Sequence, residues 1–68
     1  MKKNHEFKVD DLVTLIDPKA AQELAAANTD IDWPVPVISH YGQRVHCWNS
    51  QRREFTITLS ATEIKKVN

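Results

Sequence analysis

Three histidines and the only cysteine are the side chains of this chain best suited to bind a transition metal. Imidazole nitrogen and cysteine sulfur are the usual zinc ligands in proteins. His46 and Cys47 are adjacent in the sequence, so in a strand their side chains point to opposite faces. Neither His5 nor His40 stands at a spacing that completes a tetrahedral set. We therefore expect no metal site and no other cofactor.

The same cysteine could form a nucleophile-base pair with a histidine, which requires an exposed thiol in electropositive surroundings. Cys47 lies inside a β-prone run, so we expect it to pack in the core. Four carboxylates stand in two close pairs, Asp10 with Asp11 and Asp30 with Asp32. Each pair flanks a predicted turn and lacks calcium-loop spacing, which favours solvated turn residues over acid-base or cation-binding groups.

A chain with one glycine has no glycine-rich phosphate loop. With no convincing catalytic set, we expect a protein that is not an enzyme. An active site assembled across the symmetry axis of an oligomer is the remaining enzymatic alternative.

The aromatic residues make a better candidate site. Trp33, Tyr41 and Trp48, with prolines nearby, could line a shallow groove of the kind in which small β domains hold peptides. A predicted helix adds an apolar side chain, and the predicted partner-binding residues are Leu24, Trp33, Pro34, Tyr41 and Trp48. The alternative is that one or both tryptophans complete an undersized core.

Arginines near two predicted hairpin ends suggest nucleic-acid binding as a second function. Small barrels grip RNA or DNA through aromatic residues interleaved with basic ones, and the candidates here are Arg44, Trp48, Arg52 and Arg53. Nine basic residues offset nine acidic ones, however, so the chain lacks the overall positive field that draws a protein to nucleic acid. A solvated loop is the structural alternative for these arginines.

Short strands and a short helix must position these candidate side chains. The β-rich run 11–16 predicts a first strand. Asp17 then supplies an N-cap acceptor and Pro18 the first helical residue, so the alanine-rich sequence predicts a helix over 18–27 that ends at Asn28.

A helix of this length does not survive alone in water and must dock on the rest of the domain. Ala21, Leu24 and Ala25 lie at helical spacing and form a small apolar stripe for that purpose. Residues 28–32 read as an acidic loop.

The segment 33–38 is extended because each proline disfavours helix in the residue before it. Pro34 and Pro36 lack an N–H on the same side of the strand, which predicts a sheet edge there. Gly42 and Gln43 then indicate a two-residue hairpin loop. That loop would pair His40 with Val45, Ser39 with His46, Ile38 with Cys47 and Val37 with Trp48.

After a polar turn over 49–53, the run 55–59 alternates strictly with period two. Phe55, Ile57 and Leu59 are predicted to face the core. Residues 60–63 read as a 3₁₀-like turn, after which Ile64 and Val67 return to the body of the domain in a last short strand. Short strands joined by tight turns favour a compact antiparallel barrel.

Several of these segments resemble the YodC-like proteins, a family of small bacterial proteins of unknown function. The resemblance rests on five stretches: residues 7–15, 34–38 and 44–47, the pair Arg53-Glu54, and 62–64. It implies an SH3-like barrel. Three departures stand out, because Asp10 replaces a common glycine, Trp48 directly follows the cysteine, and residues 18–32 replace a much shorter turn.

The resulting prediction is one domain over 1–68, mostly β, an SH3-like antiparallel barrel of about five short strands with a helical insertion at 18–32. Residues 1–6 are predicted to be disordered. No signal peptide, membrane span or disulfide is evident, which favours a cytoplasmic protein without membrane contacts. Its predicted function is non-catalytic binding of an unidentified protein partner, and nucleic-acid binding is the alternative.

Overall fold

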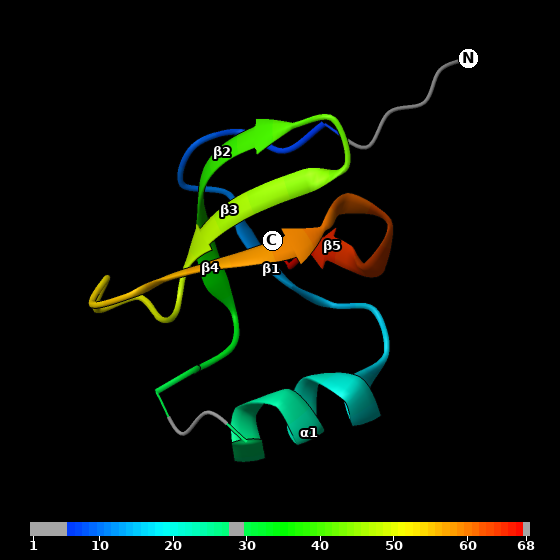
Figure 1. The fold of residues 1–68 in the computed structure, drawn as a ribbon, viewed down its shortest axis with the longest axis vertical. Coiled ribbons are helices and arrows are strands. Elements are labelled where there is room, and N and C mark those ends of the chain that lie inside the picture. The colour runs from blue at the N-terminus through cyan, green and yellow to red at the C-terminus, as the bar shows by residue number, and fades with distance from the viewer. Residues whose placement is uncertain (1–5, 28–29, 68) are drawn as a thin grey trace.

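In the described part of the chain, five antiparallel strands form one open sheet in the order β4-β3-β2-β1-β5, and a single α-helix follows the first strand (Figure 1). The computed structural model describes residues 6–27 and 30–67. The elements are β1 Leu12–Leu15, α1 Pro18–Ala27, β2 Val35–Tyr41, β3 Arg44–Trp48, β4 Thr56–Ser60, a 3₁₀ helix Ala61–Glu63, and β5 Ile64–Lys66. Apart from the exposed Glu6, the predicted disordered segment 1–6 lies outside the described residues, as does Asn28.

The predicted start of α1 is confirmed. The Lys19 N–H donates to Asp17 Oδ1 at 3.0 Å, and the Ala21 N–H donates to the Asp17 carbonyl at 3.0 Å. Pro18 is the first helical residue, where its missing N–H costs nothing. Asp17 therefore fixes the point at which the chain leaves β1 and turns into the helix.

The predicted docking stripe also faces the body of the domain. Ala21 is buried, and Leu24 and Ala25 are half-buried. The Trp33 indole N–H donates to the Ala21 carbonyl at 2.9 Å, so the residue that begins the return to the sheet also holds the helix. Figure 1 shows α1 lying across one end of the sheet, beyond β4 and the end of β1.

The prediction that Pro34 and Pro36 mark a sheet edge is wrong, because β2 lies in the middle of the sheet. The first part of β2 pairs with β1, where Pro36 lies opposite Leu12. From Val37 onward β2 pairs with β3. The prolines interrupt main-chain bonding only before the β3 pairing begins, so they limit where β2 changes partner.

The two-residue hairpin loop at Gly42 and Gln43 is confirmed, and Gly42 has the positive φ of 59° that such a loop requires. Two of the predicted pairs are confirmed: His40 with Val45 and Ser39 with His46. The other two are wrong because the register shifts between Val37 and Ser39, and Cys47 pairs with Val37. An extra residue in one strand shifts the partners of every residue beyond it.

The core lies on one face of the curved sheet. Its fully buried apolar residues come from the three strands β1, β2 and β3 and are Val13, Val35, Val37, Val45 and Cys47. Phe7, Leu59, Ala61 and Ile64 complete it.

Two residues predicted to face the core are exposed. Leu59 is buried and Ile57 packs partly against the core as predicted, but Phe55 is 57% exposed because it precedes β4, at the end of the sheet where the core stops. Val67 is 49% exposed because β5 ends at Lys66 and Val67 falls on the face opposite to Ile64.

An ion pair joins two residues with left-handed backbone. Asp10 has φ of 72° and Arg53 has φ of 60°, and the Arg53 guanidinium donates to Asp10 Oδ1 at 2.9 Å. Both side chains are at least half exposed, so the pair contributes little by itself.

This geometry predicts that Asp10→Gly is more stable than Asp10→Ala by about 1 kcal/mol, because glycine adopts positive φ without a steric penalty. Both variants remove the ion pair, so their difference isolates the backbone effect. Urea denaturation measures this difference in the free energy of unfolding between the two variants. Equal midpoints for the two variants would contradict the assignment of strain to this position.

Candidate functional site

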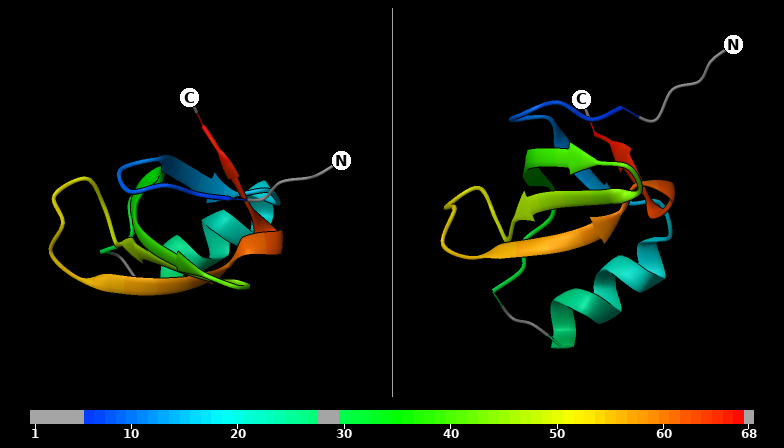
Figure 2. Two further views of the ribbon diagram at one scale, coloured as in Figure 1. Left: turned by 90° about the horizontal axis from the view of Figure 1, so that it is seen from above. Right: turned by 45° about the horizontal axis from the view of Figure 1, so that its top comes forward.

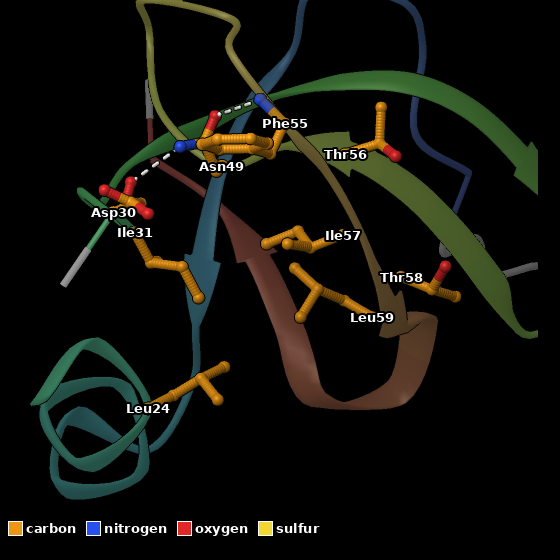
Figure 3. A pocket seen from close by; sticks show the side chains of 9 residues that line it. All are labelled: Leu24, Asp30, Ile31, Asn49, Phe55, Thr56, Ile57, Thr58 and Leu59. Atoms are coloured by element: carbon orange, nitrogen blue, oxygen red, sulfur yellow. Dashed lines mark hydrogen bonds between the residues drawn. The ribbon is translucent and has the colours of Figure 1, made fainter. Parts of the chain in front are cut away.

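A groove of about 370 Å³ separates α1 from β4 (Figure 3). Its apolar lining comes from the helix, the segment before β2 and the fourth strand, and consists of Leu24, Ile31, Phe55, Ile57 and Leu59. Polar residues border it, namely Asp30, Asn49, Thr56 and Thr58. We call this feature the α1–β4 groove.

The groove exists because α1 has too few large apolar side chains to cover β4. Ile57 and Leu59 point toward the core side of β4, and Figure 3 shows them facing Ile31 and Leu24 across a gap. Leu24 is the only large apolar side chain of α1, whose other apolar positions are alanines. The alanine-rich stripe therefore docks the helix but leaves apolar surface of β4 uncovered.

Phe55 stands at the mouth of the groove. Its ring is 57% exposed, an uncommon placement for a phenylalanine beside other apolar side chains. Figure 3 shows the ring lying over the Asn49 side chain at the end of the groove where β4 begins. The exposed ring extends the apolar surface outward from the groove.

The buried side chain of Asn49 forms hydrogen bonds at the end of the groove where β4 begins. Its Nδ2 donates to the Asp30 carbonyl at 2.7 Å, and its Oδ1 accepts N–H bonds from Glu54 at 3.2 Å and Phe55 at 2.9 Å. Its own carbonyl accepts the Asp32 N–H at 2.9 Å. One side chain therefore connects the β3–β4 turn to the loop that carries Ile31.

A second, polar hollow adjoins this end of the groove. It is lined by Asp30, Ile31, Asp32, Ser50, Arg52 and Glu54. Asp30 and Ile31 line both features. Three exposed carboxylates and one guanidinium give this end a net negative charge.

The structure places the residues predicted to bind a partner in different parts of the molecule. Leu24 lines the α1–β4 groove, and Trp33 packs against the core while bonding to α1. Tyr41 is 72% exposed at the β2–β3 hairpin, opposite Arg44. Trp48 is half-buried at the other end of β3, about 13 Å along the strand from Arg44.

Tyr41 and Trp48 therefore cannot line one shallow groove. Pro34, also a predicted binding residue, is half-buried just before β2 and is joined to Trp33 by a cis peptide bond. Of the residues predicted from the sequence to bind a partner, Leu24 lines the groove between α1 and β4. The alternation of residues 55–59 predicts that Phe55 and Ile57 face the core, but it does not reveal how completely the opposite wall of the groove covers them.

The predicted arginines do not form one cluster either. Arg44 begins β3, whereas Arg52 and Arg53 lie in the turn that follows it. Arg53 is bound to Asp10, which offsets its charge. His46 lies between the two ends of β3, where its ring meets Tyr41 edge-on with centroids 6.5 Å apart.

The side chains considered for metal binding are also dispersed. In residues 6–27 and 30–67, no three histidine, cysteine, aspartate or glutamate side chains gather around one point. His40 accepts the Phe7 N–H at 3.1 Å through Nδ1, and His46 lies near Thr58. His5 lies outside the described residues.

Cys47 is fully buried in the core, and this burial raises the pKa of its thiol from 9.0 to about 11. We predict that a thiol reagent such as Ellman's reagent reacts with the native protein at least about a thousandfold more slowly than with the denatured chain, because reaction requires opening of the core. Reaction at similar rates would contradict this burial.

The same shift predicts a loss of stability in alkali. The unfolded chain releases the thiol proton near pH 9 and the native protein only near pH 11, so the stabilising contribution is present below pH 9 and is lost as the pH rises to 11. Denaturation midpoints measured across this range should fall more steeply for the wild type than for Cys47→Ala. Parallel curves would contradict the prediction.

No protein-family model matches the chain, and searches of the curated proteins and of the solved structures return no match. Within the described ranges, no helix is both long enough and apolar enough to cross a membrane.

Proposed function

We propose that this chain is a small, non-catalytic binding protein that docks onto a partner protein through the α1–β4 groove. The observation that carries the proposal is the apolar surface left open between Leu24 and Ile57, which continues outward onto the exposed ring of Phe55. Aromatic anchors beside a partly open apolar pocket are typical of the energetic centre of protein interfaces.

The location of this surface supports the proposal further. The groove is formed by the helical insertion, which adds surface that a minimal barrel does not need. Its walls are held by the Asn49 hydrogen bonds on one side and by the Trp33–Ala21 bond on the other. A groove that is held open in this way needs little ordering before it binds.

Two exposed aromatic residues provide a matched test. The partner should be recovered from lysate of the source cell by the wild type and by Tyr41→Ser, and lost with Phe55→Ser. Both substitutions remove exposed rings, so neither should disturb the core. Capture that depends on Tyr41 and is unaffected by Phe55→Ser would assign binding to the outer face of the sheet and overturn the proposal.

A second candidate function, single-stranded nucleic-acid binding, has one observation in its favour. Val45 and Cys47 are buried, so Arg44, His46 and Trp48 share the outward face of β3. Bases could stack on Trp48 while Arg44 contacts phosphate. The balanced net charge and the Asp10–Arg53 ion pair weigh against it. Titration of labelled RNA and DNA at low salt tests this candidate directly.

We also infer that the fold is of the SH3-like barrel type and that the chain is related to the YodC-like proteins. What supports this is the return of β5 to β1 after a 3₁₀ turn, together with the left-handed backbone at Asp10, where that family commonly has glycine.

A further inference from the structure

The outer edge of β4 borders the α1–β4 groove. In Figures 1 and 2, β4 is the last strand of the sheet on the side of α1. Across the described part of the chain, β4 pairs with β3 and with no other strand. The main-chain groups on its outer side are therefore available beside the apolar lining.

The register identifies which groups these are. The Asn49 N–H donates to the Phe55 carbonyl at 2.7 Å, and the Ala61 N–H donates to the Gln43 carbonyl at 2.8 Å, which places both of these opposite pairs at hydrogen-bonding positions of the β3–β4 ladder. Hydrogen-bonded pairs alternate with unbonded pairs along an antiparallel ladder. Ile57 therefore directs its N–H and C=O toward β3, whereas Thr56 and Thr58 direct theirs away from it.

The two edges of the sheet differ in composition. β5, the opposite edge, carries Lys65 and Lys66, and charged side chains of this kind discourage the addition of another strand. Residues 55–60 contain no charged residue and no proline. The β4 edge is thus longer than the three-residue β5 edge, uncharged and rich in β-formers, which is the pattern of a strand that accepts a partner.

We propose that the β4 edge binds an extended peptide segment of a partner protein as an additional antiparallel strand, with alternate apolar side chains filling the α1–β4 groove. Thr56 and Thr58 would exchange main-chain hydrogen bonds with the peptide. The peptide residues that lie on the same face of the sheet as Ile57 and Leu59 would enter the groove and cover the half-buried side chains of Leu24 and Ile57.

The negative charge beside the beginning of β4 predicts which residues one end of the peptide contains. Asp30, Asp32 and Glu54 outnumber Arg52 beside the beginning of β4. An antiparallel peptide brings its C-terminal end to the beginning of β4. The complementary segment therefore has alternating apolar residues followed by lysine or arginine at its C-terminal end.

This inference rests on the proposed function and specifies how that function is carried out. A suitable probe is the acetylated, amidated heptapeptide valine-threonine-valine-threonine-valine-lysine-lysine, titrated against the full chain by calorimetry. A second peptide has N-methyl groups on the residues whose N–H would face β4. A third peptide carries the two lysines at its N-terminal end.

The first peptide should bind in a saturable manner. N-methylation should weaken binding at least about tenfold, because it removes main-chain donors and leaves the side chains unchanged. Moving the lysines should weaken it severalfold, and this difference should shrink at high salt. Thr58→Pro should reproduce the loss caused by N-methylation, since the Thr58 N–H has no bond to β3; circular dichroism establishes that this variant folds.

Absence of saturable binding by the first peptide would overturn the inference, as would equal affinity of the N-methylated peptide. A dimer that pairs two β4 strands would also overturn it, because a second copy would then occupy the edge; sedimentation of the free protein detects this. Capture of a partner that depends on Phe55 but is unaffected by Thr58→Pro would retain the proposed function and reject strand addition.

Discussion

Asn49→Ala should destabilise the protein by about 3 kcal/mol, because it leaves two N–H groups and one carbonyl without their partner. Asn49 is 1% exposed, so water replaces these bonds poorly. A domain of this size has about 3–10 kcal/mol of stability in total. The substitution should therefore lower the melting temperature by about 10–20 °C.

Ser50→Ala is the matched control, since Ser50 is adjacent and also buried. Its hydroxyl accepts a single N–H bond, from Arg52 at 3.2 Å, so its loss should cost less than about 1 kcal/mol. Thermal and urea unfolding compare the two variants. Equal effects of the two substitutions would contradict the central role of Asn49 in joining the turn to the loop at 30–32.

Trp33→Ala should lower the free energy of unfolding by about 2–3 kcal/mol and should allow α1 to unfold before the sheet does. The indole packs against the core and donates its N–H to the Ala21 carbonyl, and a helix of ten residues cannot persist after losing its support. Hydrogen exchange should show the amides of α1 exchanging faster than those of β2 and β3. Trp48, the other tryptophan of the chain, remains as a fluorescence reporter of the sheet.

Trp33→Phe separates packing from hydrogen bonding. It retains an aromatic ring and removes the N–H donor, so it should cost about 1 kcal/mol and leave α1 folded. If Trp33→Ala left the exchange of α1 amides unchanged relative to the sheet, another contact would have to hold the helix. The groove would then depend on a different residue for its shape.

Local signals in the sequence predicted much of the fold. Asp17 and Pro18 indicated where α1 begins, and Gly42 indicated the hairpin loop; each depends only on the conformations that neighbouring residues allow. The register beyond Ser39 and the partner of Pro36 depend on which strands meet, and local propensity carries no information about a bulge or a change of partner.

The candidate site was less predictable for a related reason. Alternation places Phe55 and Ile57 on the core face of β4, but only the packing of α1 shows that this face is left partly uncovered. Asn49 resembles an ordinary turn residue in the sequence. Its three side-chain hydrogen bonds join Asp30 to the β3–β4 turn, a contact between distant parts of the chain.

Hydrogen exchange of the β4 amides tests the central claim most directly. In the free protein the Thr56 and Thr58 amides should exchange fast, because they face away from β3, while Ile57 is protected by its bond to that strand. Addition of the valine-threonine heptapeptide should slow exchange at both threonines and leave Tyr41 unchanged. Fast exchange at Thr56 and Thr58 in the saturated complex would contradict strand addition at the α1–β4 groove.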